Sequence, residues 1–425
     1  MTMRSSSISH VPVCHVVYAK FPADPRVRRE VRTLESVGFT VDVLCLRTDK
    51  EDRAEVMPGV RVRRLPLGPR RGSRLRYAYQ YVTFFLLVSV NLVVAHAFRR
   101  YRIIHVHSLP DFLILAAVPC RALGARLVLD LHESMPEIYR ARFPRFGGSF
   151  VERLSVLVQR VSCAFANRTI TVNPTIGAIL ESRGVPRERI VVVENSPDWP
   201  VEIGGPKPEL VSGDSAEITI VGGLNPERDL RLVLTAAKRL REIVRIQVRW
   251  RIIGPGEPSF VQALRDQVSR LGIEDVVTIE GEVPATLVPS ILARATVGVV
   301  SYQRNPLTEI ATPNKAYEYA VAGKAMVVAD LPALRRLLGD TVRYYIPGNA
   351  EDLALNVQWL LEHPSERGLL ELAARQRIAG HRWEIMADRL IRVYQECLAS
   401  DGVFPRFEPE REGSSEPTWR PSDGR

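Results

Sequence analysis

Cysteine is scarce in this chain of 425 residues, and its placement argues against a disulfide framework and against a cysteine zinc site. The five cysteines are scattered, odd in number and mostly set within apolar runs, with no Cys-x-x-Cys pair: Cys14, Cys45, Cys120, Cys163 and Cys397. Disulfide frameworks and cysteine zinc sites need regular, closely spaced cysteines. We therefore expect reduced thiols that fill the core of a cytoplasmic protein without a zinc site. The first 20 residues also lack the long apolar segment of a signal peptide.

Motifs that identify several enzyme classes are also missing. The loop YAKFPADPRVRRE (18–30) contains no glycine, and the glycines of VGGLNPERDL (221–230) have the wrong spacing for a dinucleotide-binding G-x-G-x-x-G turn. The chain has no P-loop, no H-E-x-x-H and no G-x-S-x-G. It also lacks an acidic D-x-D turn of the kind that holds a metal–diphosphate. We therefore predict no metal and no cofactor, with cationic side chains and helix N-termini neutralising a bound diphosphate.

The composition is that of a basic globular protein. Hydrophobic residues make up 46% of the chain, which is enough for substantial cores, and the length suggests two or three domains. The formal net charge of +10 favours anionic partners such as nucleotides, phosphates, nucleic acid or acidic lipid.

Strand-like apolar runs alternate with helical runs almost throughout, which predicts an α/β fold with parallel sheets covered by helices on both faces. A segment rich in Pro, Gly and acidic residues interrupts this alternation, which then restarts. We therefore predict two doubly wound, Rossmann-like domains that face each other across a cleft. The predicted parts are an N-terminal domain at 1–195, a linker at 196–216, a C-terminal domain at 217–380, a helix at 381–400 that packs back on either domain, and a disordered tail at 401–425.

Polar residues gather where the predicted strands end. In open α/β sheets, ligands bind beyond the carboxyl ends of the strands, so the cleft between the two domains is the expected site. Each residue alone has a simpler explanation: Asp111 can cap a helix, and one histidine at a strand end is more often structural. The candidates are Lys20, Asp24, Arg26, His107, Asp111, His132, Gly223, Arg228, Gly254, Gly256, Glu309, Asn314, Lys315 and Glu318.

The segment EIATPNKAYEYAVAGKAMVVAD (309–330) predicts a loop, a short helix and a buried strand. Thr312 is expected to cap the helix and Pro313 to occupy its first position. Gly323 is expected to end the helix in a left-handed conformation, and AMVVA (325–329) to form the strand.

The same helix is suited to an anion. Its N-terminus carries a partial positive charge and free N–H groups, Lys315 adds a full charge, and Glu318 lies one turn further on the same side. A phosphate at the N-terminus and a sugar diol beside Glu318 would together be one ligand of nucleotide size. The alternative is a capped surface helix with a Lys–Glu pair, and this segment alone does not decide between them.

Seven segments resemble blocks of one protein family, in the family's order. They are DPRVRREVRTLESVGFTVDVL (24–44), HVHSLPDFLILAA (105–117), DLHESMPE (130–137), RGVPRERIVVVENSPD (183–198), IVGGLNPERDL (220–230), RIIGPGE (251–257) and TPNKAYEYAVAGKAMVVA (312–329). Over residues 11–399 the chain resembles a GT-B fold glycosyltransferase of the large retaining family 4. The resemblance implies transfer of a sugar from a nucleotide-diphosphate-sugar donor to an acceptor, with retained anomeric configuration.

The resemblance also implies roles for single residues. Glu318 matches the second glutamate of the family's Glu-x7-Glu motif, which holds the donor ribose. Lys315 and Arg228 match basic residues at the donor diphosphate, and His132 matches a histidine near the transferred sugar. The other donor-side residues are Gly223, Gly254, Gly256 and Asn314, of which Gly254 and Gly256 match the loop around the base. The acceptor-side candidates are Lys20, Asp24, Arg26, His107 and Asp111.

The sequence departs from the family pattern in three places. The first glutamate of the motif falls at Ile310, so either a shifted loop lets Glu309 act as a catalytic residue or that contact is missing. The family often has arginine at the position of Gly223, which leaves more of the phosphate charge to Arg228. The loop after the first strand lacks the family's usual glycine pair.

The family mechanism implies an oxocarbenium-like state in which the leaving diphosphate accepts the acceptor's proton. Electrostatic stabilisation of that diphosphate would be the protein's main contribution. Two other classes remain open, a GT-B type sugar-nucleotide 2-epimerase and a basic nucleic-acid-binding protein. The sequence lacks an exposed basic stripe with base-stacking aromatics, so we expect no nucleic-acid partner.

Residues 61–102 contain an apolar helix between arginine clusters. Tyr81–Phe98 is apolar nearly all round and close to the lower length limit of a transmembrane helix. A span would separate VPVCHVVYA from RIIHVHS, two runs that should share one sheet, so we expect none. The helix is therefore either buried in the N-terminal domain or lies in the membrane interface with its arginines on anionic headgroups. The second alternative predicts a peripheral protein at the inner face of the cell membrane, with a glycan or lipid-linked acceptor.

Overall fold

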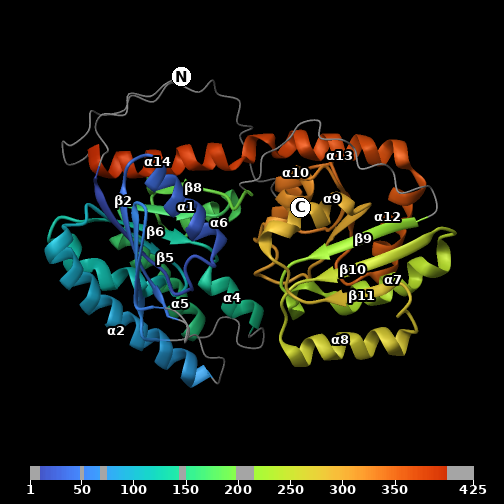
Figure 1. The fold of residues 1–425 in the computed structure, drawn as a ribbon, viewed down its shortest axis with the longest axis horizontal. Helices are drawn as coiled ribbons and strands as arrows, with labels where there is room; N and C mark the ends of the chain where they lie inside the picture. The colour runs from blue at the N-terminus through green and yellow to red at the C-terminus, as the bar shows by residue number, and fades with distance from the viewer. Residues whose placement is uncertain (1–9, 48–51, 68–73, 143–149, 198–214, 400–425) are drawn as a thin grey trace, which may run out of the picture.

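The computed structural model describes residues 10–47, 52–67, 74–142, 150–197 and 215–399, which form two α/β domains side by side (Figure 1). Each domain is built on its own sheet. The predicted tail at 401–425 and most of the predicted linker at 196–216 lie outside the described residues.

The first domain holds an eight-stranded sheet in the order β3-β4-β2-β1-β5-β6-β7-β8. All neighbours are parallel except β3 and β4, which pair antiparallel at one edge. The central strands are almost wholly buried, as expected for a parallel sheet with helices on both faces. The elements are β1 (Pro12–Val16), α1 (Pro25–Ser36), β2 (Thr40–Leu46), β3 (Ala54–Met57), β4 (Val60–Leu65), α2 (Arg74–Arg99), β5 (Ile103–His107), the 3-10 segment η1 (Asp111–Ala117), α3 (Val118–Ala122), β6 (Arg126–Leu131), α4 (Met135–Arg142), α5 (Phe150–Phe165), β7 (Arg168–Thr171), α6 (Pro174–Ser182), η3 (Arg187–Arg189) and β8 (Ile190–Val192).

The second domain holds a six-stranded, all-parallel sheet in the order β11-β10-β9-β12-β13-β14. Its elements are β9 (Ser215–Val221), η4 (Pro226–Arg228), α7 (Leu230–Ile243), β10 (Gln247–Ile253), α8 (Pro258–Leu271), β11 (Val277–Glu280), η5 (Ala285–Leu287), α9 (Val288–Arg294), β12 (Val297–Val300), α10 (Asn314–Val321), β13 (Ala325–Ala329), α11 (Pro332–Leu338), β14 (Arg343–Tyr345), α12 (Ala350–Glu362), α13 (Pro364–Ile378) and η6 (Ala379–His381). The C-terminal helix α14 (Trp383–Ala399) follows this domain in sequence. The two parallel sheets confirm the predicted GT-B fold class.

The strand order reverses once in each sheet. In the first sheet β1 pairs with both β2 and β5, and in the second β9 pairs with both β10 and β12. Such a reversal opens a crevice at the carboxyl ends of the strands, where open α/β sheets bind ligands. Each domain therefore has one place, at this reversal of strand order, where a ligand is expected to bind.

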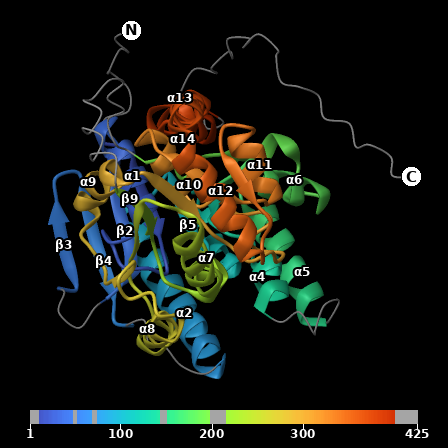
Figure 2. The ribbon, with the colours of Figure 1, turned by 90° about the vertical axis from the view of Figure 1, so that its right-hand side faces the viewer.

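The C-terminal helix α14 packs on the first domain although it follows the second in sequence (Figures 1 and 2). Met386, Leu390 and Tyr394 belong to the same buried core as β1 and β2. The indole N–H of Trp383 donates a hydrogen bond of 3.1 Å to Thr33 Oγ1 on α1. The sequence left the choice of domain open, and these long-range apolar contacts decide it.

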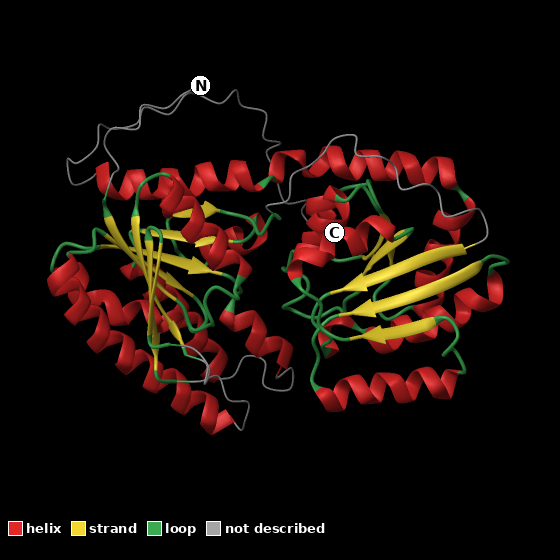
Figure 3. Cartoon of the chain, viewed as in Figure 1, coloured by secondary structure: helices red, strands yellow, loops and turns green. Residues whose placement is uncertain are grey.

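Helix α2 covers the outer side of the first sheet (Figure 3). It has apolar residues on two opposite faces. One face, spaced by four residues, is buried: Gln80, Phe84, Val88, Leu92 and His96. The other face is 49–84% exposed: Tyr79, Val82, Leu86, Val90, Val94 and Phe98. Among the described helices, this one has the length and composition of a membrane span, at Tyr79–Arg99, with 22% of that window buried. The strands β1 and β5, which precede and follow this helix in the chain, share one sheet, as predicted.

Candidate active site

The helix α10 follows β12 and presents its N-terminus at the switch point of the second sheet. It begins at Asn314 with Pro313 as N-cap, and no described side chain caps it. The predicted cap by Thr312 is wrong, because Thr312 Oγ1 instead accepts a hydrogen bond of 3.2 Å from Asn173 Nδ2 of the first domain. Uncapped N–H groups at a helix N-terminus are an anion-binding site.

Lys315 and Glu318 form an ion pair on α10 as an i, i+3 pair, and each side chain is 13% exposed. The alternative of a capped surface helix with a Lys–Glu pair is therefore met only in part, because the pair is present and the cap is not. Gly323 has φ of +65° and ends the helix, and β13 follows at 325–329, as predicted. The amides of Gly323 and Lys324 donate to the carbonyls of Ala320 and Tyr319, which close the helix.

Arg228 lies beside α10, in the short segment η4 after β9. Its Nη1 donates to the carbonyl of Val221 at 3.2 Å, and its guanidinium lies 5.5 Å from the ring centre of Tyr302, which follows β12. Ser301 Oγ donates to the Arg228 carbonyl at 2.7 Å. The loop therefore holds Arg228 over the ends of β9 and β12, the point where the strand order reverses.

Glycines let the loops after β9 and β10 approach each other closely. Gly222 has φ of +131°, and a Cβ there would lie 2.5 Å from the Arg228 guanidinium. Gly254 has φ of +150°, and a Cβ there would collide with the Gly222 carbonyl. Gly256 forms an isolated β-bridge with Leu224. A Cβ added at Gly223 would meet almost open space. The predicted base-loop residues Gly254 and Gly256 thus lie next to the Arg228 loop.

Tyr319 fixes α10 in place and was missed by the sequence analysis. Its hydroxyl donates a hydrogen bond of 2.6 Å to the Thr219 carbonyl on β9, and its ring packs over Gly298 of β12. A Cβ at Gly298 would lie 2.5 Å from the Tyr319 ring. The single glycine inside the strand VGVV was the available signal, because a strand glycine often marks a close approach.

His132 lies in the first domain, after β6, and its side chain is 19% exposed. Its Nε2 is 2.9 Å from Asp130 Oδ2, and its backbone N–H donates to Ser108 Oγ at 3.2 Å. His132 borders a pocket of about 270 Å³ at the switch point between β1 and β5. The pocket is lined by Val17, Tyr18, Ala19, Asp24, Tyr81, Ser108, Leu109 and His132.

Asp130 holds this side of the site together and was not predicted. Arg26 donates to both of its oxygens, at 2.7 and 2.8 Å, and to the Val193 carbonyl at 2.8 Å. Burial opposes ionisation of Asp130, but the charge of Arg26 and the bonds from His132 and His107 hold its pKa well below the usual range. A carboxylate that stays charged fixes the position of His132.

Three acceptor-side predictions need correction because the side chains are buried. Arg26 is 3% exposed and is saturated by Asp130 and the backbone. His107 is 0% exposed and lies between Asp130 and His15. Asp111 is also 0% exposed, does not cap η1, and accepts from Gln159 Nε2 at 3.2 Å. None of the three side chains has a surface for an acceptor; they position their neighbours.

The other two acceptor-side candidates remain accessible. Asp24 caps α1 by accepting from the amides of Arg26 and Val27 at 3.0 and 3.2 Å, and it also lines the pocket. Lys20 is exposed in the loop after β1.

The region around Glu309 and Ile310 lies partly at the contact between the two domains. Glu309 lies 3.6 Å from Arg304, and its side chain is 39% exposed. Ile310 is buried in the core cluster of the first domain, and its carbonyl accepts from Asn173 at 2.9 Å. The position of the family's first glutamate is therefore an apolar contact between domains.

The two halves of the site face each other. Asn173 joins the loop before α10, and the Tyr317 hydroxyl of α10 donates to Glu194 at 3.3 Å. Desolvation raises the pKa of Glu133, and the charge of Glu227 from the second domain raises it further. Because Glu133 follows His132 and Glu227 precedes Arg228, these two loops lie opposite one another.

Family models match both domains. A glycosyl transferase 4-like domain matches residues 23–196, and a glycosyl transferases group 1 domain matches residues 215–363. Together these matches contain every strand of the two sheets except β1. The class defined by fold and site is a GT-B glycosyltransferase. The chain belongs to the retaining glycosyltransferase family 4 and uses a nucleotide-sugar donor, which decides against the epimerase and nucleic-acid alternatives.

Individual relatives are distant. A D-inositol 3-phosphate glycosyltransferase from Thermobispora bispora is 25% identical over 393 residues, 86% of this chain and 88% of the relative. A putative teichuronic acid biosynthesis glycosyltransferase, TuaH of Bacillus subtilis, is 23% identical over 171 residues, 38% of this chain and 40% of the relative. The solved structure of Anabaena HepE in complex with UDP-glucose shares the fold at a TM-score of 0.68 and 14% identity, over 91% of this chain and 99% of that chain.

Proposed function

We propose that the protein transfers a sugar from a UDP-sugar to a lipid-linked or polysaccharide acceptor, without a metal ion, at the cytoplasmic face of the cell membrane. The observation that carries the proposal is the uncapped N-terminus of α10, with Lys315 and Glu318 on its first turns and Arg228 beside it. UDP-glucose in the HepE complex supports the choice of nucleotide, and the name of TuaH supports a role in envelope polysaccharide synthesis.

The donor diphosphate is assigned to Arg228, Lys315 and the N–H groups of α10. These groups neutralise the charge that develops as the glycosidic bond breaks, and preorganised donors of this kind usually contribute the largest catalytic term. Glu318 accepts hydrogen bonds from the donor ribose and releases Lys315 toward phosphate. His132, held by Asp130, borders the transferred sugar, and the leaving phosphate takes the acceptor's proton.

The acceptor is assigned to the pocket beside His132. Tyr18 and Tyr81 supply flat apolar walls for a sugar, and Asp24 and Ser108 supply hydrogen-bonding groups. Tyr81 belongs to α2, whose exposed apolar face begins at Tyr79. A lipid-linked acceptor would reach the pocket along this helix.

The membrane contact is assigned to the exposed face of α2 together with α5. Four residues of α5 are 43–79% exposed: Phe150, Val151, Leu154 and Leu157. Both helices pack against the same segment, η1. Arg76, Arg99 and Arg100 are exposed at the ends of α2, where they can meet anionic headgroups.

A thermal-shift panel of nucleotide sugars tests the donor assignment, because a ligand that binds only the folded protein raises its melting temperature. A UDP-sugar should raise the melting temperature of the wild type and raise it less in Lys315→Met. Proton NMR of the product should then give the same anomeric configuration as the donor. No shift with any nucleotide sugar, or an inverted product, would contradict the proposal.

A further inference from the structure

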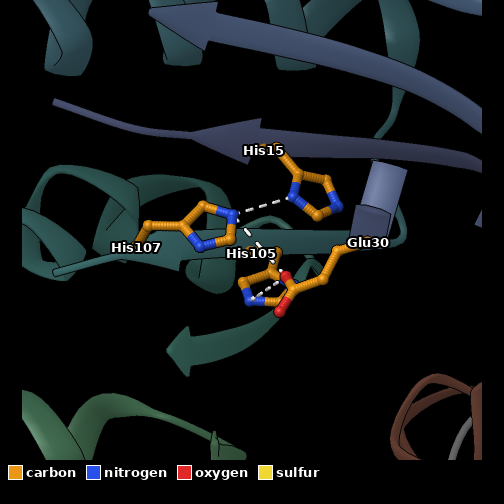
Figure 4. A group of neighbouring side chains, drawn as sticks. All are labelled: His15, Glu30, His105 and His107. Carbon is orange, nitrogen blue, oxygen red and sulfur yellow. Dashed lines mark hydrogen bonds and ion pairs between the residues drawn. The ribbon is translucent and has the colours of Figure 1, made fainter. Parts of the chain in front are cut away.

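Four buried side chains converge in the first domain (Figure 4). One of them, His107, lies next to His132, with its Nδ1 3.1 Å from His132 Nε2. His15 comes from β1, His105 and His107 from β5, and Glu30 from α1. Each offers one nitrogen or oxygen, and these four atoms all lie within 4.8 Å of one another. All four side chains are 0% exposed, so no substrate reaches them. We call these four residues the buried histidine cluster.

The spacing of the inner atoms suits a metal ion. His15 Nδ1 lies 2.9 Å from His107 Nε2. Glu30 Oε2 lies 3.8 Å from His105 Nε2 and 4.0 Å from His107 Nε2. In a tetrahedral zinc centre, bonds of about 2.0–2.1 Å place the ligand atoms about 3.3–3.4 Å apart. These three distances lie on both sides of this value, and all pairs of the four atoms lie within 4.8 Å.

The outer atom of each residue already has a partner outside the cluster. Histidines that bind metals almost always pass their second ring nitrogen to a carboxylate, carbonyl or similar group, which fixes the ring. Three outer nitrogens have hydrogen-bond partners: His107 Nδ1 with Asp130 Oδ2 at 3.1 Å, His105 Nδ1 with the Tyr394 hydroxyl at 2.8 Å, and His15 Nε2 with the same hydroxyl at 3.0 Å. Glu30 Oε1 has an ion pair, without a hydrogen bond, with Arg26 Nε at 3.1 Å. The inner atoms are thereby turned toward one point.

Two inner atoms lack a hydrogen bond. Glu30 Oε2 and His105 Nε2 have no hydrogen-bond partner among the described residues, although both are fully buried. Buried polar atoms without partners are costly and rare in folded proteins. A cation between them satisfies both atoms at once.

We propose that His15, Glu30, His105 and His107 bind one divalent transition-metal ion. Zinc is the ion that best fits three imidazoles and a carboxylate in a closed, tetrahedral site without redox chemistry. All four positions are taken by protein and none faces solvent, so the ion is structural. It ties β1, β5 and α1 together and, through Tyr394, holds α14 on the first domain.

A second group, His107, Asp130 and His132, also has ligand atoms within 4.8 Å of one another but is less suited to an ion. Both oxygens of Asp130 already accept hydrogen bonds from Arg26. The assignment therefore stays with the buried histidine cluster.

The test uses the full-length protein, unfolded in the presence of chelator and refolded with or without Zn²⁺. After gel filtration, elemental analysis should find one equivalent of zinc, and the melting temperature should be higher with zinc than without it. Refolding with Co²⁺ should give the visible absorption of a tetrahedral centre. Glu30→Gln and His105→Gln should each bind zinc at least about tenfold more weakly. His96→Gln, which removes a buried histidine of α2 outside the cluster, should bind zinc like the wild type.

Three results would overturn the inference. The first is a wild type that refolds with substoichiometric zinc and an unchanged melting temperature. The second is a full equivalent of zinc in Glu30→Gln and His105→Gln, which would place the ion elsewhere. If those variants do not fold, X-ray absorption of the wild-type zinc protein decides, since three imidazole ligands are expected and fewer would contradict the assignment.

Discussion

The two domains use charged residues in opposite ways. In the second domain, Lys315 and Glu318 stay partly accessible at the start of a helix that no described side chain caps. In the first domain, Arg26, Glu30 and Asp130 are 0–3% exposed and pair with one another. A charge that meets a ligand has to remain within reach of solvent, whereas a buried charge with partners fixes geometry. We therefore assign donor binding to the second domain and the positioning of His132 to the buried network of the first domain.

The largest effect is expected from breaking the buried network. Asp130→Asn removes one of the two carboxylates that pair with the buried Arg26 charge, and losing one partner of a buried ion pair typically costs about 3–5 kcal/mol of stability. Asp330→Asn breaks a more exposed pair of the second domain, in which Arg335 Nη2 donates to Asp330 Oδ2 at 2.9 Å, and should cost less than about 1 kcal/mol. Melting temperatures of the two variants, measured beside the wild type, compare the domains directly. Equal losses would contradict the distinction.

A second buried carboxyl should destabilise the folded protein when it is charged. Burial raises the pKa of Asp111 to about 7, with a smaller contribution from Glu137, although Gln159 and Arg183 oppose the shift. Because the folded pKa lies above that of the unfolded chain, stability falls as pH rises from about 4 to about 7 and then levels off.

Asp111→Asn keeps the shape of the side chain without the charge. It should stabilise the protein by on the order of 2–4 kcal/mol above pH 7 and by almost nothing near pH 4. Chemical unfolding at pH 5, 6, 7 and 8 measures this difference. A variant whose gain does not grow with pH would show that Asp111 is ionised in the fold.

The helix of the proposed donor site was predictable from sequence because its residues are neighbours in the chain. Segment 309–330 contains the loop, the helix and the strand, and its local pattern specified the helix, the left-handed Gly323 and β13. Thr312 was the exception, because its hydroxyl bonds Asn173 in the other domain. No local pattern records a contact 139 residues away.

The acceptor side was predicted less well because its polar residues come from distant segments. Arg26, His107 and Asp111 follow strand ends, like the accessible Asp24, and sequence position alone does not separate buried from exposed side chains. Asp130 was missed because it lies within the apolar run RLVLDL. Only the fold brings Arg26 to Asp130, 104 residues away.

The outer surfaces of the two domains should differ in membrane binding, because we assign the membrane contact to the exposed apolar face of α2 in the first domain. The protein should float with anionic vesicles and detach as salt rises. Leu86→Gln combined with Phe98→Gln should lower vesicle binding roughly tenfold or more, from the loss of buried apolar area. Leu369→Gln with Leu372→Gln, two exposed leucines of α13, should leave it unchanged. Equal flotation of both double variants would remove α2 from the contact.

Each arginine near the start of α2 should contribute less to vesicle binding than the apolar face does. Arg70, Arg71, Arg74 and Arg76 changed together to Gln should shift most of the protein to the soluble fraction, at about 1 kcal/mol for each charge. Arg70 and Arg71, and the side chain of Arg74, lie outside the described residues, and Arg76 is exposed. Donor binding should not change, because the donor residues lie in the second domain.

Chelator should have no effect on transfer. The donor diphosphate is assigned to Arg228, Lys315 and the α10 N-terminus, and an ion in the buried histidine cluster would be too enclosed to exchange during a short assay. Initial rates with and without excess EDTA should therefore agree. Loss of activity that magnesium or manganese restores would contradict the metal-independent donor site.

Calorimetric titration of a UDP-sugar into the wild type, Glu318→Gln and Glu351→Gln tests the central claim most directly. Glu318→Gln should bind the donor at least about tenfold more weakly, roughly 1.4 kcal/mol, because charge-assisted hydrogen bonds to the ribose are lost. Glu351→Gln changes an exposed glutamate of α12 that pairs with Arg239 of α7, and it should bind the donor like the wild type. Equal affinity in all three folded proteins would show that α10 does not hold the donor.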